Sequence, residues 1–270
     1  TCLIVSYFLP AGALIPSNEK EAPIPLKCNY HTHTSRCKHA VGKDEDYVKA
    51  ALDAGYDELG FSDHMPWPYA THFISDCRME AAQLPDYLAS VRGLRDRYQD
   101  RLPIHIGLES EYYPRYRAHL DRLLDDGSVE YLILGMHFLD SDEDHPYIGP
   151  LCRTDDGVKR YAEAVIRAID TGLFKYLAHP DVFLIYRTPD QFNAVCEEAS
   201  IQIAKAAAAK HMPMEYNLLG LLSQLDGSAP RGYPSELFWK TVRPYAGDVL
   251  IGVDAHDPKQ LTHPKTFSTA

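Results

Sequence analysis

Residues 129–138 read VEYLILGMHF, a run of apolar, β-branched and aromatic residues that carries a histidine near its end. Such a run is typical of a strand that is buried on both faces, as the strands of a parallel sheet are. Runs of similar character occur at residues 27–31, 57–62, 103–109, 174–178, 212–216 and 248–253. We therefore expect seven strands between residue 27 and the C-terminus.

Longer stretches with a helical period separate these runs. The clearest are residues 44–55, 84–101, 157–172 and 193–210. Strands that alternate with helices predict a parallel sheet, and seven such units in one domain suggest a barrel related to the (β/α)8 type. An open doubly wound sheet is the structural alternative. The chain has no GxGxxG or Walker A sequence, which weakens a nucleotide-binding version of that alternative.

Composition narrows the functional classes. The 270 residues are 45% hydrophobic and 24% charged, with a formal net charge of −11 and no run of lysine or arginine. A generic nucleic-acid binder is not expected, because such proteins use basic residues against phosphates. A small anionic substrate stays possible, since bound divalent cations reverse the local field. The six cysteines form no CxxC pair and are too sparse for a disulfide framework, so we expect reduced thiols.

The N-terminal residues read differently from the rest. The apolar run at 2–15 is too short to span a bilayer, and residues 16–26 are rich in proline and charge. We interpret residues 1–26 as an extension and linker, and residues 27–270 as one domain. The apolar run resembles part of a signal peptide but has no basic residues before it. We expect a cytoplasmic protein without membrane contact, with export as the alternative.

Histidines and carboxylates gather where the expected strands end. In β/α barrels the catalytic residues lie at the C-terminal ends of the strands. Side chains two residues apart in an extended chain point to the same side, so His31 and His33 can grip one metal ion. Further strands end at similar groups, which makes nine candidate metal ligands: His31, His33, His39, His64, Glu109, His137, His179, Asp254 and His256.

One histidine at a strand end is more often a structural residue than a ligand, so the evidence lies in the set. A tetrahedral site takes three or four ligands. Nine donors fit three sites that share a bridging carboxylate and leave positions for water and substrate. Imidazole suits zinc, iron and manganese, and carboxylate favours the harder ions. We therefore expect two or three divalent ions, either zinc, manganese or iron.

The same residues resemble the motif series of the PHP (polymerase and histidinol phosphatase) superfamily. The matching segments are His31-x-His33, Ser62-Asp63-His64, Gly135-Met136-His137-Phe138, Ala178-His179-Pro180-Asp181 and Asp254-Ala255-His256. Within that superfamily the chain most resembles the histidinol-phosphate phosphatases, through Asn29-Tyr30-His31-Thr32-His33-Thr34, Arg36-Cys37-Lys38-His39-Ala40, Met214-Glu215-Tyr216-Asn217 and Tyr233-Pro234-Ser235. The resemblance runs from about residue 28 to 258.

The resemblance implies a distorted (β/α)7 TIM-like barrel with a trinuclear metal site. His31, His33, Glu109 and Asp254 would hold the first ion, and Glu109 would bridge to the second, which His137 and His179 complete. The third ion would be held by His39, His64 and His256. The chain departs from the family at Gly252-Val253-Asp254, where serine usually precedes the aspartate, and in its short tail after His256, where a closing helix could be absent.

The function implied is hydrolysis of L-histidinol phosphate to L-histidinol and phosphate, a step of histidine biosynthesis. We expect metal-activated hydroxide to attack phosphorus, with Glu109, Asp254 and His256 as the catalytic residues. Arg160 and Arg187, followed by Arg153, are the candidates for gripping the phosphate. His256 or Asp63 could protonate the leaving group, as could a metal-bound water. An acidic rim of Glu111, Asp140 and Asp142 would suit a cationic substrate end.

Other readings stay open at this point. The same barrel could act on another small phosphomonoester, a nucleotide or a 3′ DNA end, although the chain lacks the basic interleaving that a strand-binding groove needs. A non-catalytic metal-binding module is the second alternative. The expected partner is a small phosphorylated substrate, and the sequence gives no oligomeric state.

Overall fold

The computed structural model describes residues 27–227 and 232–263. Its strands are all parallel. A first sheet has the order β1-β2-β3-β4, and a second pairs β5 with β6. The register places Cys28 beside Glu58, Leu59 beside Ile104, and Gly107 beside Tyr131. The bounds are β1 Cys28–Asn29, β2 Glu58–Phe61, β3 Ile104–Ser110, β4 Tyr131–Leu134, β5 Met214–Asn217 and β6 Val249–Gly252.

Isolated bridges connect these two sheets at both sides. Leu177 pairs with Leu134 of β4 and with Met214 of β5, and Thr32 after β1 pairs with Ala255 after β6. The strand predicted at residues 174–178 is therefore reduced to a single bridged residue. The result is an α/β fold with a curled parallel sheet, in which both chain segments that follow β1 and β6 lie side by side.

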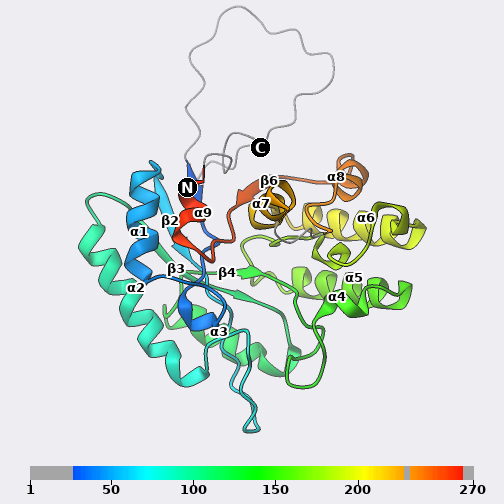
Figure 1. Cartoon of the computed structure of the whole chain (residues 1–270). Coiled ribbons are helices and arrows are strands. Elements are labelled where there is room, and N and C mark those ends of the chain that lie inside the picture. The colour runs from blue at the N-terminus through cyan, green and yellow to red at the C-terminus, as the bar shows by residue number, and fades with distance from the viewer. Residues whose placement is uncertain (1–26, 228–231, 264–270) are drawn as a thin grey trace, which may run out of the picture.

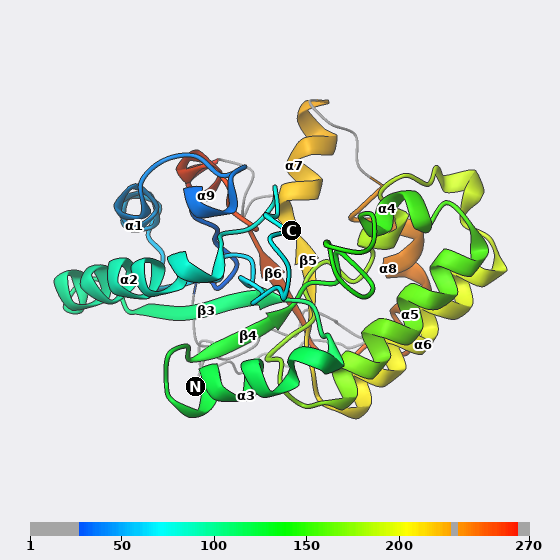
Figure 2. The ribbon, with the colours of Figure 1, turned by 90° about the horizontal axis from the view of Figure 1, so that it is seen from below.

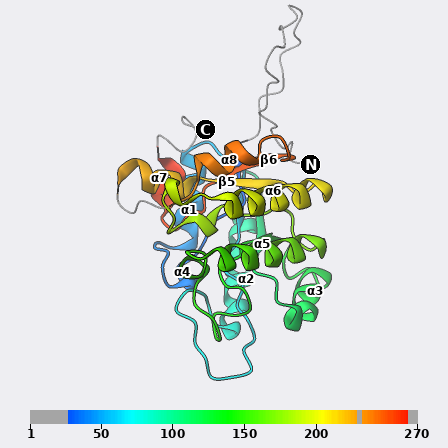
Figure 3. The same cartoon turned by 90° about the vertical axis from the view of Figure 1, so that its right-hand side faces the viewer.

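Helices cover the outside of the curled sheet (Figures 1 and 2). Helices α1 and α2 lie to one side, and α5, α6 and α8 lie to the other (Figure 1). Figure 3 shows α5, α6 and α8 packed as a group. The four predicted helices are confirmed as α1 Asp44–Asp53, α2 Leu84–Tyr98, α5 Asp155–Asp170 and α6 Ala194–Ala209. The sequence patterns did not mark α3 Arg117–Asp125, α4 Ile148–Leu151, α7 Leu218–Asp226, α8 Glu236–Val242 and α9 Pro258–Thr262.

Helix α9 corrects the expectation that a closing helix could be absent after His256. Its first turn is capped by Asp257, whose side chain accepts a hydrogen bond from the backbone N–H of Lys259. The helix packs against α1. Five residues are too few for a strong helical signal, so the pattern alone could not mark it. Short 3-10 helices occur at Ser35–Cys37, Ala81–Gln83, Pro114–Tyr116, Val182–Leu184 and Pro189–Gln191.

Tyr131 shows how the interior of the sheet is packed. It is buried, and its hydroxyl donates to the backbone carbonyls of Tyr30 and Phe61, 2.9 Å away in each case. A Cβ at Gly60 or Gly107 would overlap the Tyr131 side chain. Glycine is therefore required at both positions for strands β1 to β4 to curl around this ring. No helix in the described part of the chain is long and apolar enough to cross a bilayer.

Candidate metal centre

The nine predicted ligands converge at the ends of the strands. The ends of β1 and β6 are joined by two backbone hydrogen bonds, from His33 N to Ala255 O at 2.9 Å and from Ala255 N to His31 O at 3.1 Å. Met65 N likewise donates to Glu109 O at 2.7 Å, which joins the ends of β2 and β3. These bonds bring side chains together that are far apart in the sequence.

Glu109 lies at the centre of this group. Its carboxylate oxygens are 2.9 Å from His179 Nε2, 3.0 Å from His64 Nδ1 and 3.4 Å from His137 Nε2. The Nε2 atoms of His31 and His33 follow at 3.5 and 3.4 Å. A Cβ at Gly135 would overlap the Glu109 carboxylate, so the glycine after β4 makes the room that this side chain occupies.

Asp254 forms a second focus beside Glu109. One of its oxygens lies 3.1 Å from His33 Nε2, and 3.4 Å from both His31 Nε2 and His256 Nδ1. Asp254 and His179 both have a positive φ, at 54° and 29°. For residues other than glycine this left-handed region costs energy, and such strain concentrates at functional sites.

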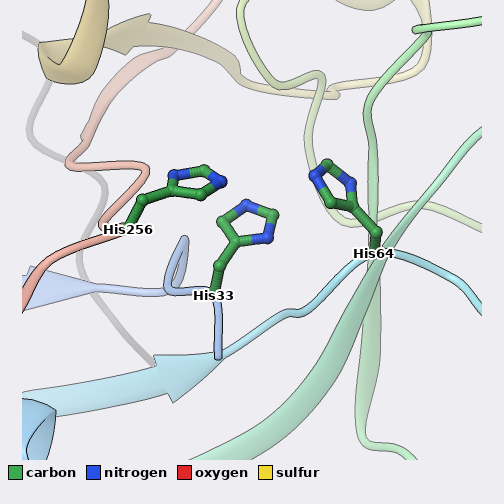
Figure 4. Close-up of side chains that lie close together, drawn as sticks. All are labelled: His33, His64 and His256. Atoms are coloured by element: carbon green, nitrogen blue, oxygen red, sulfur yellow. The ribbon is translucent and has the colours of Figure 1, made fainter. Parts of the chain in front are cut away.

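Three histidines from different strand ends lie close together in this group (Figure 4). The ring of His33 lies 4.0 Å from that of His256 and 4.3 Å from that of His64, measured between centroids. His39 joins them, with its ring 4.7 Å from that of His256. All nine predicted side chains are thus brought together by the fold.

The donor atoms form sets that suit metal ions. Three side chains offer donors within 4.8 Å of one another in each of these groups: His31, Glu109 and His179; His31, His33 and Asp254; His33, His64 and His256. The Nε2 atoms of His31, His33 and His256 are also buried without a hydrogen-bond partner among the described residues. Buried polar atoms are rarely left unpaired, so these orphan nitrogens fit bound cations. The sulfur of the buried Cys37 lies in a further group with His39 and His256.

Most of these imidazoles also have a polar partner at Nδ1. His31 Nδ1 lies 2.8 Å from Glu215 Oε2, and His137 Nδ1 lies 3.4 Å from Glu111 Oε1. Backbone carbonyls serve the same purpose for His39, at 2.7 Å from Cys37 O, and for His256, at 2.9 Å from Asp254 O. A group that occupies Nδ1 fixes the tautomer and directs Nε2 to the metal, as is usual for ligating histidines.

Burial and nearby charges divide the imidazoles into two kinds. Burial opposes protonation of His31 and His33, but the surrounding carboxylates raise the pKa of both, that of His33 to about 9. Burial and the neighbouring His33 instead lower the pKa of His64 and His39, and lower that of His256 to about 3. The pKa of Asp254 is held well below its ordinary value, although burial opposes this, because His31 and His33 lie beside it.

A cavity of about 350 Å³ opens over the cluster. Seven of the nine candidates line it, whereas His31 and His33 are fully buried beneath. Arg78 is the one lysine or arginine side chain that lines it within the described parts of the chain. The remaining wall is partly apolar and aromatic, formed by Cys77, Phe138, Tyr147, Val182, Leu219 and Tyr233.

The arginines predicted to grip phosphate lie elsewhere. Arg160 is exposed on α5, and Arg187 donates to Cys152 O at 2.6 Å, Gln191 O at 2.8 Å and Asp155 Oδ1 at 3.2 Å. Neither lines the cavity, and Arg153 lies over the ring of Tyr186. Sequence order placed Arg160 soon after a strand end, but in the structure it is an exposed residue of α5 (Asp155–Asp170).

The predicted acidic rim is also arranged differently. Glu111 and Asp142 are buried and both contact Arg78, at 2.9 Å in each case. Asp140 is exposed, 3.3 Å from His145. No carboxylate of this trio therefore lines the cavity as a free charge. Sequence reasoning did not single out Arg78, because a lone arginine in a loop gives no signal of its own.

Comparison with known proteins places this geometry in a family. The family model described as PHP domain matches residues 29–218. The chain belongs to the PHP domain family. This PHP domain is 27% identical over 240 residues to a probable histidinol-phosphatase of Deinococcus radiodurans, covering 87% of this chain and 88% of the relative. It is 29% identical over 121 residues to the histidinol-phosphatase of Bacillus subtilis, covering 43% of this chain and 45% of the relative.

Two solved structures share the fold of this PHP domain. A putative histidinol phosphatase from Listeria monocytogenes has a TM-score of 0.70 at 19% identity, covering 90% of this chain and 100% of that one. Histidinol phosphate phosphatase from Lactococcus lactis, solved with zinc, L-histidinol and phosphate, has a TM-score of 0.64 at 19% identity, with 89% and 91% covered. The predicted family and the α/β fold are thus confirmed.

Proposed function

We propose that this PHP domain is a metal-dependent phosphomonoesterase that hydrolyses L-histidinol phosphate to L-histidinol and phosphate. The observation that carries the proposal is the convergence of nine histidine and carboxylate side chains, seven of which line one cavity, with unpaired buried ring nitrogens among the nine. The probable histidinol-phosphatase of Deinococcus radiodurans, which matches over most of both chains, supports the choice of substrate.

The barrel proposed with this function is a closed, distorted (β/α)7 arrangement. Its support is the pair of connections between the two sheets, through Leu177 on one side and between Thr32 and Ala255 on the other. Together with strands β1 to β6, Leu177 would supply the seventh strand position. Closure of this kind directs all strand ends toward one mouth, which is where the cavity lies.

The proposed ligand sets share the central carboxylate. His31, His33, Glu109 and Asp254 would hold one ion, and Glu109, His137 and His179 a second. His39, His64 and His256 would hold a third, with Glu109 and Asp254 close to this group as well. When bound, divalent ions supply positive charge for the phosphoryl oxygens and lower the pKa of a coordinated water.

The protein's own residues define the rest of the site. His31 and His33, buried beneath the cavity, are fixed by backbone bonds between the ends of β1 and β6. Asp63 is fully buried, where it accepts from the Thr34 hydroxyl and from His64 N, so we assign it to positioning rather than proton transfer. His256 lines the cavity, but its Nδ1 bonds Asp254 O and its Nε2 is assigned to the third ion, so a water on a bound ion would be the group that exchanges a proton with the leaving oxygen.

The aromatic wall is proposed to receive the organic end of the substrate. Phe138, Tyr147 and Tyr233 line the cavity beside the ligand cluster. An imidazole ring can stack on such faces, and an ammonium group is attracted to them. Because Glu111 is neutralised by Arg78, this wall offers a better explanation for binding a cationic substrate than the acidic rim does.

The decisive experiment measures phosphate release from L-histidinol phosphate, an aryl phosphate, and a panel of sugar and nucleotide phosphates. The protein is stripped of metal and reloaded with manganese, zinc or iron. We expect kcat/KM for histidinol phosphate to exceed all others and to depend on metal. Asp254→Asn, purified in the same way, controls for contaminating phosphatases. Metal-dependent activity without that preference would reject the substrate, and no activity under any condition would reject the enzyme.

A further inference from the structure

We propose that Glu215 and Asn217 form a positioning bracket that presents His31 and Asp254 to a metal ion. The inference rests on the metal dependence in the proposed function, but not on the identity of the phosphate ester. Neither residue belongs to the nine predicted ligands. Both lie on β5, at Met214–Asn217, whereas the ligands that they contact follow β1 and β6.

The first arm of the bracket is a buried carboxylate behind a ligand. Glu215 Oε2 accepts from His31 Nδ1 across 2.8 Å, and both side chains are fully buried. The proton on Nδ1 leaves the lone pair of His31 on Nε2, which lies 3.4 Å from Asp254 and 3.5 Å from Glu109. A carboxylate behind a ligating imidazole fixes the ring and raises its basicity.

The second arm is an amide that joins two carboxylates. Asn217 Nδ2 donates to Glu215 Oε1 at 2.9 Å and to Asp254 Oδ2 at 3.1 Å. Its Oδ1 accepts from Gly220 N at 3.0 Å and so caps the N-terminus of α7. One side chain therefore ties a candidate ligand, the carboxylate behind another ligand, and the start of a helix that carries the cavity residue Leu219.

The space around Glu215 is built for its carboxylate. A Cβ at Gly252 of β6 would overlap the Glu215 side chain, so this strand comes close only because glycine is present. Glu215 contacts no lysine or arginine within the described residues, and its polar partners there are His31 and Asn217. A buried carboxylate is costly unless it is paired. A role limited to packing would be served by an apolar side chain, so the charge points to the ligand that it faces.

The test compares zinc affinities of variants by competition with a chromophoric chelator, without any substrate. Glu215→Gln keeps an acceptor for His31 Nδ1, and Glu215→Leu removes it. Asn217→Ser keeps a side chain that can cap α7 but loses the donors to Glu215 and Asp254. Asp44→Asn is the matched control, since this buried carboxylate pairs with Arg36 and Ser90 and contacts none of the nine predicted ligands among the described residues.

We expect zinc affinity to fall about tenfold to a hundredfold in Glu215→Leu and less in Glu215→Gln, with Asn217→Ser also weakened. The control should bind zinc within about twofold of the wild type. At saturating metal, kcat of Glu215→Gln should recover. Variants that fold, as judged by circular dichroism, yet bind zinc as tightly as the wild type would overturn the proposal. If Glu215→Leu does not fold, the zinc affinities of Glu215→Gln and Asn217→Ser decide the test. Because the zinc competition contains no substrate, the measured zinc affinities are independent of the proposed esterase activity.

Discussion

The metal centre has an inner and an outer part that differ in charge. The inner part consists of His31, His33, Glu109, His179 and Asp254, all of them buried. The outer part consists of His39, His64 and His256, which lie toward the cavity mouth. The pKa of every inner imidazole is raised, whereas the pKa of every outer imidazole is lowered.

The difference shows what carboxylates do to buried imidazoles. Burial lowers an imidazole's pKa in both parts. Glu109 and Asp254 reverse this for the inner rings, with Glu215 behind His31, whereas the neighbouring His33 adds to it for the outer rings. The inner part must therefore release protons before it accepts cations, while the outer part is already neutral. One cluster of similar residues thus contains two chemical environments.

The largest expected effect comes from removing the shared inner carboxylate. Glu109→Gln keeps the shape of the side chain but removes the charge that five imidazoles contact. We expect kcat/KM for phosphate release to fall on the order of a thousandfold or more, which corresponds to about 4 kcal/mol. Metal content measured alongside activity separates lost ions from lost chemistry.

A matched substitution in the outer part sharpens the comparison. His39 contacts neither Glu109 nor Asp254 within hydrogen-bond distance among the described residues. His39→Ala should therefore reduce kcat/KM less than Glu109→Gln does. Equal losses in the two variants would contradict a division of the centre into two parts.

Asp181 is another buried carboxylate, and it lies two residues after the inner ligand His179 in the sequence. Burial raises its pKa from an ordinary 3.8 to about 7. A raised folded-state pKa stabilises the protein below pH 4, and this contribution is lost as pH rises through 7. Asparagine does not ionise, so Asp181→Asn should not show this loss. The free energy of unfolding of the variant minus that of the wild type should therefore rise by up to about 4 kcal/mol between pH 4 and 7. Urea denaturation of the metal-free proteins measures it, and parallel pH profiles would contradict it.

Proton release on metal binding tests the charge difference directly. With a pKa of about 9, His33 is protonated at neutral pH in the metal-free protein. Each ion that binds His33 must displace that proton, so zinc affinity should rise about tenfold per pH unit from 7 to 9. Calorimetry in buffers of different ionisation enthalpy counts the protons. In His33→Ala the steep dependence should be reduced, whereas in His39→Ala, where burial keeps the pKa low, it should persist.

The smallest effect is expected outside both parts. Arg160 is exposed on α5 and does not line the cavity, so Arg160→Ala should change kcat/KM by no more than about twofold. Arg187→Ala should lower the melting temperature, because this side chain is 6% exposed and bonds the loops at Cys152 and Gln191. A raised KM in Arg160→Ala would instead support the contact between Arg160 and phosphate that the sequence predicts.

The sequence pattern could indicate the nine candidate ligands because each of them is marked by its immediate neighbours in the sequence. His31 and His33 alternate along one extended segment, and His137, His179 and Asp254 each follow an apolar run. Strand ends of parallel β/α units share one edge, so position in the pattern is enough to predict proximity. The same logic cannot say whether Arg160 faces the cavity, which it does not line, because a helix turns its side chains through all directions while the pattern records only which element a residue belongs to.

Residues behind the ligands carry no such signal in the strand pattern. The segment Met214-Glu215-Tyr216-Asn217 supports the family resemblance, but neither it nor the loop around Arg78 indicates which residues these charges contact. Their roles depend on partners distant in sequence: Glu215 on His31, 184 residues away, and Arg78 on Glu111, 33 residues away. Nothing in either segment specifies the partner.

The sequence by itself determined the alternation of strands and helices, the family, and the nine side chains at the strand ends, since periodicity and motif order are properties of the chain. The tertiary structure decided which charges face one another. Pairing of Thr32 with Ala255 brings the two ends of the sheet together, and only then do Asp254, His31 and Glu215 share one environment. Electrostatic energies depend on distance and burial, and both are set by packing between segments remote in sequence.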